Sequence, residues 1–336
     1  MSKVGIREIS EATGFSPATV SKALNGRAGV NAKTVQTIRD TAKQLGYVTA
    51  QQGGTLAFVL ARKSGRIIDD STFHPAVIEG VEAQAKEMGL KTSFATLTMD
   101  DPEVVRAEID ELLSDPLSPA VVLATELDDN ELALFGPYAD RVVLLDNLSE
   151  TARFDSVVIA NRISAKAAVK FLAARGHSDI GYLACDFRIH NFAMRETGYL
   201  EGLNEAGLAY NEKWRVSLGT HLDEVYAGMG EWLDTNGTDD LPTAFFADSD
   251  LIAVGALRAL TERGVKVPED VSLFGFDDGQ LGAFSVPALS TVHVMRREMG
   301  EIAVRRAVGK LANPKSYTCA TQVQTDLVER DSVATR

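Results

Sequence analysis

The N-terminal fold is decided by residues 6–47, IREISEATGFSPATVSKALNGRAGVNAKTVQTIRDTAKQLGY, in which apolar residues recur at helical spacing between two interruptions. Gly14 ends the first helical pattern, because a tight turn there requires a positive φ that glycine adopts freely. Ser16 is a favourable N-cap for a second helix, and Pro17 suits its first position, where the missing N–H is not needed. Asn31 is placed to cap a third helix. The pattern predicts three short helices around one small core.

The second predicted helix has two different faces. Val20, Ala23 and Leu24 share its inner face. The opposite face presents Ala18 and Lys22. In a helix-turn-helix the N-terminal part of the second helix enters the DNA major groove, and surrounding polar groups bind phosphates. Lys22 is then placed to donate to guanine, and Ala18 to touch a thymine methyl. The predicted DNA-binding residues are Ser16, Pro17, Ala18, Thr19, Ser21, Lys22, Asn25, Arg27, Asn31 and Tyr47.

The charge of this N-terminal segment differs from that of the rest of the chain. Residues 1–47 hold seven Lys or Arg side chains against three Asp or Glu, whereas the whole chain of 336 residues has a net charge of −13. Phosphate repels an acidic body, so only the basic head suits nucleic acid. The chain is also longer than one core usually supports, which predicts two or three globular domains.

Several classes of protein lack support in the sequence. Cys185 and Cys319 are the only cysteines, they lie far apart, and no His or Cys cluster surrounds them, so we expect two reduced thiols and no metal site or cofactor. No export signal opens the chain, and no apolar run reaches the roughly 20 residues that a membrane span needs. We therefore expect a cytoplasmic protein without a membrane partner.

The body shows two consecutive series of short apolar strands separated by helices. The first series predicts strands at 55–61, 92–97, 120–125, 141–146 and 156–161. The second series predicts strands at 179–185, 214–219, 244–248 and 271–278. Nearly uninterrupted apolar strands alternating with helices indicate parallel sheets covered on both faces. The predicted fold class is a small all-α helix-turn-helix head followed by two doubly wound α/β lobes, with a ligand cleft at the strand carboxyl ends.

Both parts of the chain resemble one known family. The run SPATVSKALN (16–25), followed by VNAKT and LGY, resembles the head of the lactose-repressor (LacI/GalR) family of bacterial transcription regulators. The body resembles that family's sensor, which is similar to periplasmic sugar-binding proteins. The stretches that carry this resemblance are FHPAVIEGVEAQAKEMG (73–89), ARGHSDIGYLA (174–184), MRETGYLEGL (194–203), ADSDLIAVGALRAL (247–260) and VPEDVSLFGFDD (267–278). The resemblance spans residues 5–332 and implies that the chain crosses between lobes near Asn161, near Thr291 and near residue 320.

The resemblance therefore implies three parts. A DNA-binding domain at 1–47 is joined by a linker at 48–54 to an effector-binding and dimerisation domain at 55–332. The implied N-lobe comprises about 55–160 and 292–319, and the implied C-lobe comprises about 161–290 and 320–332. The final segment, 331–336, is predicted to be a frayed tail.

Polar residues that end apolar strands or open the next helix are the candidate ligand contacts. Carboxylates and amides next to an arginine suit hydrogen bonding to sugar hydroxyls, with an aromatic ring for stacking. The predicted effector-binding residues are Phe73, His74, Asp146, Asn161, Arg195, Asp248, Ser249 and Asp277. In the family, positions that match Arg195 and Asp277 commonly hold the effector.

Each candidate also has a structural alternative. Ser249 or Asp248 fits the role of a helix cap, and Asp146 that of a loop anchor. His74 is equally consistent with a core or rim position. Many relatives carry Asn where this chain has Ser249, and Asp where it has Ala160, so the pattern of ligand hydroxyls is left open.

The linker departs from the family. Relatives have a longer linker with a short hinge helix that inserts a leucine into the minor groove, whereas residues 48–54 contain no leucine and end in two glycines. Paired glycines disfavour even one helical turn. We expect DNA binding to rely on major-groove contacts and dimerisation rather than on a minor-groove wedge.

Together these features predict a homodimeric transcription regulator, a repressor, that binds a pseudo-palindromic operator and is controlled by a sugar between its lobes. A purine or nucleobase effector is the alternative ligand class. A transport solute-binding protein is opposed by the DNA-reading head. The third alternative is an enzyme, because carboxylates in a sugar cleft can imitate a glycosidase pair, but no nucleophile, phosphate-binding or metal motif appears.

Overall fold

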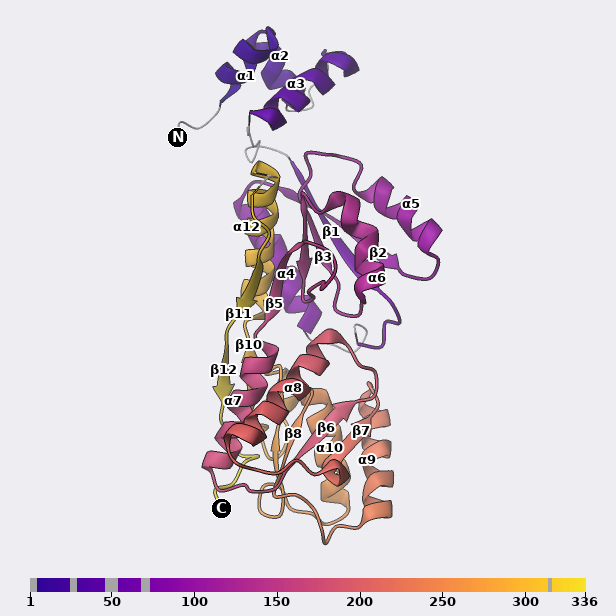
Figure 1. Ribbon diagram of the computed structural model, residues 1–336, viewed down its shortest axis with the longest axis vertical. Helices are drawn as coiled ribbons and strands as arrows, with labels where there is room; N and C mark the ends of the chain where they lie inside the picture. The colour runs from indigo at the N-terminus through magenta and orange to yellow at the C-terminus, as the bar shows by residue number, and fades with distance from the viewer. Residues whose placement is uncertain (1–4, 25–28, 46–53, 68–72, 314–315) are drawn as a thin grey trace.

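The computed structural model describes residues 5–24, 29–45, 54–67, 73–313 and 316–336. It consists of a small helical head followed by two α/β lobes, of which the N-lobe lies between the head and the C-lobe (Figure 1). The predicted fold class is therefore confirmed.

The head contains α1 (Ile6–Thr13), α2 (Pro17–Leu24) and α3 (Ala32–Gln44), packed around Ile9, Val20, Ala23, Ile38 and Ala42. Gly14 has a φ of 72° and ends α1, as its sequence position predicts. Ser16 Oγ accepts the Thr19 backbone N–H at 3.2 Å, and Asn31 Oδ1 accepts that of Thr34 at 2.8 Å. These side-chain caps explain why two helices begin where the sequence predicts.

The N-lobe is built on a six-stranded parallel sheet in the order β11-β5-β4-β3-β1-β2. Its strands are β1 (Thr55–Arg62), β2 (Lys91–Thr98), β3 (Ala120–Leu123), β4 (Val142–Leu145), β5 (Asp155–Ile159) and β11 (Ala320–Val323). Its helices are α4 (Phe73–Glu87), α5 (Pro102–Leu112), α6 (Asp129–Leu132), η1 (Ala133–Tyr138) and α12 (Arg296–Ala312). Helices α4 and α12 approach closely, because a Cβ on Gly80 would lie 2.0 Å from the Arg297 carbonyl oxygen.

The C-lobe is built on a four-stranded parallel sheet in the order β7-β6-β8-β9. Its strands are β6 (Ile180–Cys185), β7 (Arg215–Leu218), β8 (Ala244–Ala247) and β9 (Ser272–Phe274). Its helices are α7 (Asn161–Ala174), α8 (His190–Glu205), η2 (Glu212–Trp214), α9 (Leu222–Asn236), α10 (Asp250–Glu262) and α11 (Gln280–Ala283). Strands β6 and β8 are buried along their whole length, as expected for a sheet covered by helices on both faces.

Two antiparallel strands, β10 (Thr291–Val294) and β12 (Thr325–Val328), run between the lobes (Figure 1). The last crossing comes later than the sequence predicts. Residues 320–323 form β11, which pairs with β5 in the N-lobe sheet, with Ala320 opposite Ser156. The chain therefore leaves the N-lobe after Val323, slightly later than the crossing expected near residue 320.

The C-terminal segment is packed against the C-lobe, so the prediction of a frayed tail was also wrong. Ser332 is fully buried: its backbone carbonyl accepts the Leu273 N–H at 2.9 Å, and its hydroxyl donates to the Leu273 carbonyl at 2.6 Å. The hydroxyl oxygen also accepts the Ser290 N–H at 2.8 Å. The tail thus satisfies backbone groups of β9 and of the loop before β10.

Replacing Ser332 with alanine is expected to lower the free energy of unfolding by about 1–3 kcal/mol, because buried backbone groups of Leu273 and Ser290 lose their partner. Urea denaturation measures the change. Thr335 is exposed in the same tail, so Thr335→Ala is the matched control and should unfold like the unaltered protein. Equal stability of the two variants would show that the tail contributes little.

Candidate ligand cleft

A cleft of about 890 Å³, including its open mouth, lies between the two lobes. The carboxyl ends of parallel strands meet at this edge, which is the usual binding position in such sheets. Six of the eight residues predicted from the sequence line it: Phe73, His74, Asp146, Arg195, Ser249 and Asp277. Asn161 and Asp248 do not line it.

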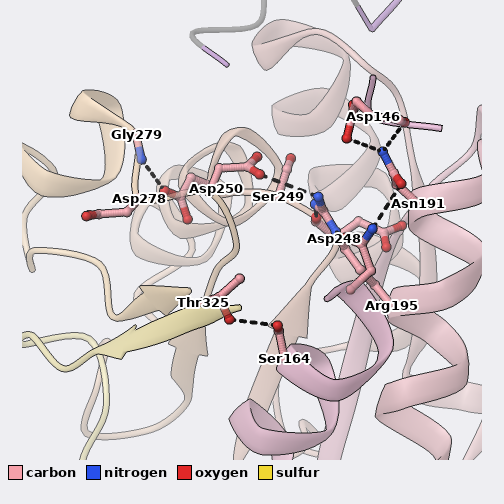
Figure 2. Close-up of polar contacts among 12 residues, drawn as sticks. Asp146, Ser164, Asn191, Arg195, Asp248, Ser249, Asp250, Asp278, Gly279 and Thr325 are labelled. Carbon is pink, nitrogen blue, oxygen red and sulfur yellow. Dashed lines mark hydrogen bonds and ion pairs between the residues drawn. The ribbon is translucent and has the colours of Figure 1, made fainter. Parts of the chain in front are cut away.

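Asp146 follows β4 and faces the cleft from the N-lobe. Its Oδ2 accepts the Thr125 hydroxyl at 2.8 Å, and its Oδ1 accepts the Asn191 side-chain amide at 2.9 Å. Because Asn191 belongs to α8, this second bond joins the N-lobe to the C-lobe (Figure 2). Burial raises the pKa of Asp146 to about 7.

Arg195 is the buried cation of the cleft. Its Nε donates to Asn161 Oδ1 at 2.9 Å, one terminal nitrogen donates to the Asp248 carbonyl, and the other lies 3.5 Å from Asp277 Oδ1. The guanidinium carbon also lies 3.7 Å from the centre of the Phe276 ring. These contacts fix the guanidinium in one orientation at the C-lobe wall.

The C-lobe wall also carries two carboxyl groups. Asp250 accepts the Thr291 hydroxyl at 2.5 Å. It also accepts the Gly279 backbone N–H at 2.7 Å (Figure 2). Burial raises the pKa of Asp250 to about 8, and the negative charge of Asp277 adds to the shift. Burial also raises the pKa of Asp277, despite the nearby guanidinium of Arg195.

The backbone is strained around these carboxyl groups. Asp146, Asp277 and Asp278 have φ values of 62°, 115° and 57°, a region that residues other than glycine seldom adopt. Strained positions of this kind cluster at functional sites, where the surrounding structure holds them in place. The strain therefore supports a binding role for this edge of the lobes.

The structure corrects the assignment of Asp248. This residue is fully buried behind the cleft wall, and its carboxylate accepts the Tyr182 hydroxyl, the Cys185 backbone N–H at 2.8 Å and the Arg188 guanidinium at 2.5 Å. Asp248 is not among the residues that line the cleft. Asp248 ties the end of β8 to the end of β6, and so positions the wall rather than the ligand.

Asn161 and Ser249 have supporting roles. The Asn161 amide donates to Asn191 Oδ1 at 2.9 Å and its oxygen accepts from Arg195, so it links two residues of the cleft wall. Ser249 caps α10 by accepting the Ile252 N–H at 3.3 Å, as its structural alternative predicts, and it also lines the cleft.

Sequence reasoning missed the other lining residues, among them the polar residues Arg66, Thr125, Asn191 and Asp250. Arg66 crosses the rim from the N-lobe and pairs with Asp186 at 3.2 Å and Glu224 at 3.8 Å in the C-lobe. Asp250 directly follows the strand-end residues Asp248 and Ser249, and this position in the sequence could have identified it as a candidate ligand contact. Thr125 and Asn191 are recognisable only through their contacts with Asp146.

The raised pKa of Asp250 predicts how stability depends on pH. Between its ordinary value and about 8, the folded protein keeps a proton at Asp250 that the unfolded chain has lost. The free energy of unfolding therefore falls as pH rises through this window and levels off above it.

Asp250→Asn should make this slope shallower by up to about 1.4 kcal/mol per pH unit. Urea denaturation at pH 5, 6.5 and 8 measures it, with Asp223→Asn on the exposed start of α9 as control. Parallel slopes for both variants would contradict a buried proton.

The predicted DNA-binding face of α2 is open to solvent. Ser16, Pro17, Ala18 and Lys22 are exposed, and Thr19 and Ser21 are partly exposed. Asn31 is exposed, but its side-chain oxygen already accepts a backbone N–H in the cap of α3. Asn25, Arg27 and Tyr47 lie outside the described residues, as does the linker apart from Gly54.

Other kinds of site find no support in the described part of the chain. Within it, no helix is both long and apolar enough to cross a membrane. The same residues contain no group of three or more His, Cys, Asp or Glu side chains placed to hold a metal ion.

Comparison with known proteins gives consistent matches. Residues 169–333 match the family model of a periplasmic binding protein-like domain. The HTH-type transcriptional regulator GalS of Salmonella typhimurium is 30% identical over 335 residues, which are 99% of this chain and 97% of GalS. The HTH-type transcriptional repressor PurR of Mannheimia succiniciproducens is 25% identical, with 98% of both chains covered. Among solved structures, the complex of the transcriptional regulator CelR with cellobiose has a TM-score of 0.72 and 25% identity, covering 98% of this chain and 99% of CelR.

Proposed function

As a member of the LacI/GalR family of transcriptional regulators, this chain is a DNA-binding regulator with a ligand-binding domain, and we propose that its ligand is an uncharged carbohydrate. Its relatives are transcription regulators and not enzymes. A regulator acts where the chromosome is, which agrees with the cytoplasmic location expected from the sequence.

The composition of the cleft lining carries this proposal. Three carboxyl groups, those of Asp146, Asp250 and Asp277, face the same space as two guanidinium groups, those of Arg66 and Arg195. Carboxyl oxygens accept hydrogen bonds from hydroxyls, and both guanidinium groups are already paired with carboxylates, Arg66 with Asp186 and Arg195 with Asp277. The lining therefore favours a neutral polyol over an anion. The aromatic rings of Phe73 and Phe192 supply apolar surface for the face of a sugar ring.

The relatives support a sugar without excluding a nucleobase. The cellobiose complex of CelR is a precedent for a disaccharide in a protein of this fold at 25% identity. PurR, a repressor at the same level of identity, keeps the purine alternative open. The choice between the two classes therefore rests on the chemistry of the cleft.

The position of the cleft suggests how the ligand acts on DNA binding. Phe73 and Asp146 line the cleft from the N-lobe, whereas Arg195 and Asp277 line it from the C-lobe. A ligand that contacts both walls changes their relative closure, and in a dimer the spacing of the two heads. It shifts the affinity for DNA only by its differential affinity for the two lobe arrangements.

A thermal-shift screen tests the ligand class. The full-length protein is heated with mono- and disaccharides, sugar phosphates and nucleobases. A sugar present at about 100 times its dissociation constant stabilises the folded state by about 2.7 kcal/mol, which gives a clear rise in melting temperature. A response to nucleobases alone would contradict the carbohydrate proposal and leave the DNA-binding regulator intact.

We further propose that the protein is a homodimeric repressor whose two heads bind the half-sites of a pseudo-palindrome. The loop after α11 supports dimerisation, because Phe284 and Val286 are 85% and 89% exposed there. Large apolar side chains that are this exposed within one loop commonly belong to protein interfaces.

Replacing Phe284 and Val286 together with serine is expected to weaken dimerisation by about a hundredfold, because two apolar anchors are removed from the interface. Sedimentation equilibrium measures the dissociation constant. Val104, 54% exposed on α5 of the N-lobe, provides the matched control Val104→Ser. A double-serine variant that stays as dimeric as this control would place the interface elsewhere.

A further inference from the structure

One nitrogen in the cleft wall is buried without a partner. His74 is the second residue of α4, is only 5% exposed, and lines the cleft. Its Nδ1 has no hydrogen-bond partner among the described residues. The other buried, unpartnered side-chain atoms in that part of the chain belong to Arg39, Arg141, Ser156, His177 and Arg306, and none of these residues lines the cleft. The orphan nitrogen therefore coincides with the ligand space.

The neighbours of His74 determine which of its nitrogens carries the proton. Its Nε2 lies 3.4 Å from the Thr125 hydroxyl oxygen. When Asp146 is ionised, that hydroxyl donates its only proton to Asp146 Oδ2 at 2.8 Å, so its oxygen accepts from the histidine. Nε2 then holds the proton, and Nδ1 is left with a free lone pair.

Two further features keep the ring in this state. Burial lowers the pKa of His74 to about 4, so the imidazole is neutral at physiological pH and does not become a double donor. The Phe73 ring stands at 86° to the imidazole with the ring centres 5.4 Å apart, which restricts its rotation. Nδ1 is thus a fixed acceptor at the N-lobe wall.

We propose that Nδ1 of His74 accepts a hydrogen bond from a hydroxyl of the bound sugar, and so selects ligands that carry a donor at this position. The inference rests on the proposed function, because it assigns a role within the same cleft. A group that only accepts, such as an ether oxygen, an ionised phosphate or an unprotonated ring nitrogen, leaves Nδ1 unpaired. His74 thereby distinguishes a hydroxyl from these groups of similar size.

The ligand gains affinity because it supplies the hydrogen bond that Nδ1 lacks among the described residues. Loss of one such bond weakens binding by about tenfold. His74→Phe removes both ring nitrogens and keeps a planar ring of similar size. His74→Asn returns a polar group close to the position of Nδ1, and so serves as the matched control. We expect about tenfold weaker sugar binding for the first variant and a smaller loss for the second.

The experiment uses the full-length protein with ¹⁵N-labelled histidine. NMR first reads the protonation of both His74 nitrogens in the free protein, where we expect Nε2–H and bare Nδ1. Cellobiose, glucose and galactose are then added in turn, and the Nδ1 resonance of His74 should shift with the sugar that binds. His177 gives an internal control, since its Nδ1 is also buried and unpartnered but lies outside the cleft. Calorimetry with the same sugar compares the unaltered protein with the two variants.

The possible results distinguish a failure of the role of His74 from a failure of the proposed ligand class. A protonated Nδ1 in the free protein would overturn the inference whatever the ligand. Equal affinity of the unaltered protein and His74→Phe for a sugar would overturn it while leaving the regulator sugar-responsive. If none of the sugars binds, both the proposed ligand class and the sugar hydroxyl as the partner of Nδ1 are rejected. The NMR measurement of the tautomer then still shows whether Nδ1 is a free acceptor.

Discussion

Replacing Arg195 with alanine is expected to abolish the effect of the ligand on DNA binding and to lower the free energy of unfolding by about 3–5 kcal/mol. The guanidinium is nearly fully buried, donates to Asn161 and to the Asp248 carbonyl, and pairs with Asp277. Its loss leaves these acceptors unpaired and an uncompensated carboxylate at the cleft wall. Gel shifts with and without the sugar, on an operator selected in vitro by the unaltered protein, measure the first effect, and urea denaturation measures the second.

Arg258 provides the matched control for this variant. It lies on the outer face of α10, its side chain is 68% exposed, and it pairs with Glu262 at 3.0 Å on the same helix. Exposed pairs of this kind contribute little because solvent screens them, so Arg258→Ala should keep both stability and ligand response. An Arg195→Ala protein that still responds fully to the sugar would contradict the assignment of the cleft.

Most strands of the core were predictable because they are buried along most of their length. Residues 55–61 were expected as a strand and β1 spans Thr55–Arg62, since an apolar run between polar turns has few alternatives in a covered parallel sheet. Strand β11 was not predicted. It lies at the sheet edge, pairs with β5 on one side only, and alternates exposed and half-buried residues, so no apolar run marks it. Only its pairing partner, far away in sequence, makes it a strand.

The cleft was predictable to the extent that it follows from strand order. Asp146 and Asp277 follow strands of different lobes, and parallel strands bring their carboxyl ends to a common edge. Asp248 was assigned by the same rule and is wrong as a ligand contact. Neighbouring residues at a strand end point to different sides, and here Ser249 faces the cleft while Asp248 points towards Tyr182 in the core. The sequence does not state which of two adjacent polar residues faces outward.

Contacts between the lobes could not be predicted at all. Asn191 and Asp146 are 45 residues apart, and their bond forms only once α8 is placed against the end of β4. The same applies to His74. The protonation of its unpartnered Nδ1 can be inferred only from the contacts with Thr125 and Asp146. Sequence patterns predict which face of an element is buried, but not which polar groups meet across two separately folded lobes.

Replacing Ala18 with glutamate is expected to weaken operator binding by more than about a hundredfold. Ala18 is the second residue of α2 and is exposed on the face proposed to enter the major groove. A glutamate there replaces an apolar contact with a base by a longer, negatively charged side chain, which is repelled by the phosphates on both sides of the groove. Fluorescence anisotropy with labelled operator at one fixed salt concentration measures the change.

Ala12→Glu separates groove insertion from simple repulsion. Ala12 is exposed on α1, so this variant adds the same charge and the same side chain to the same small domain. We expect a loss of at most several-fold, because a charge outside the groove acts only through the general field of the head, which salt screens. Equal losses for the two variants, disappearing together at higher salt, would mean that α2 does not enter the groove. A loss confined to Ala18→Glu that persists at higher salt is the result that a reading helix requires.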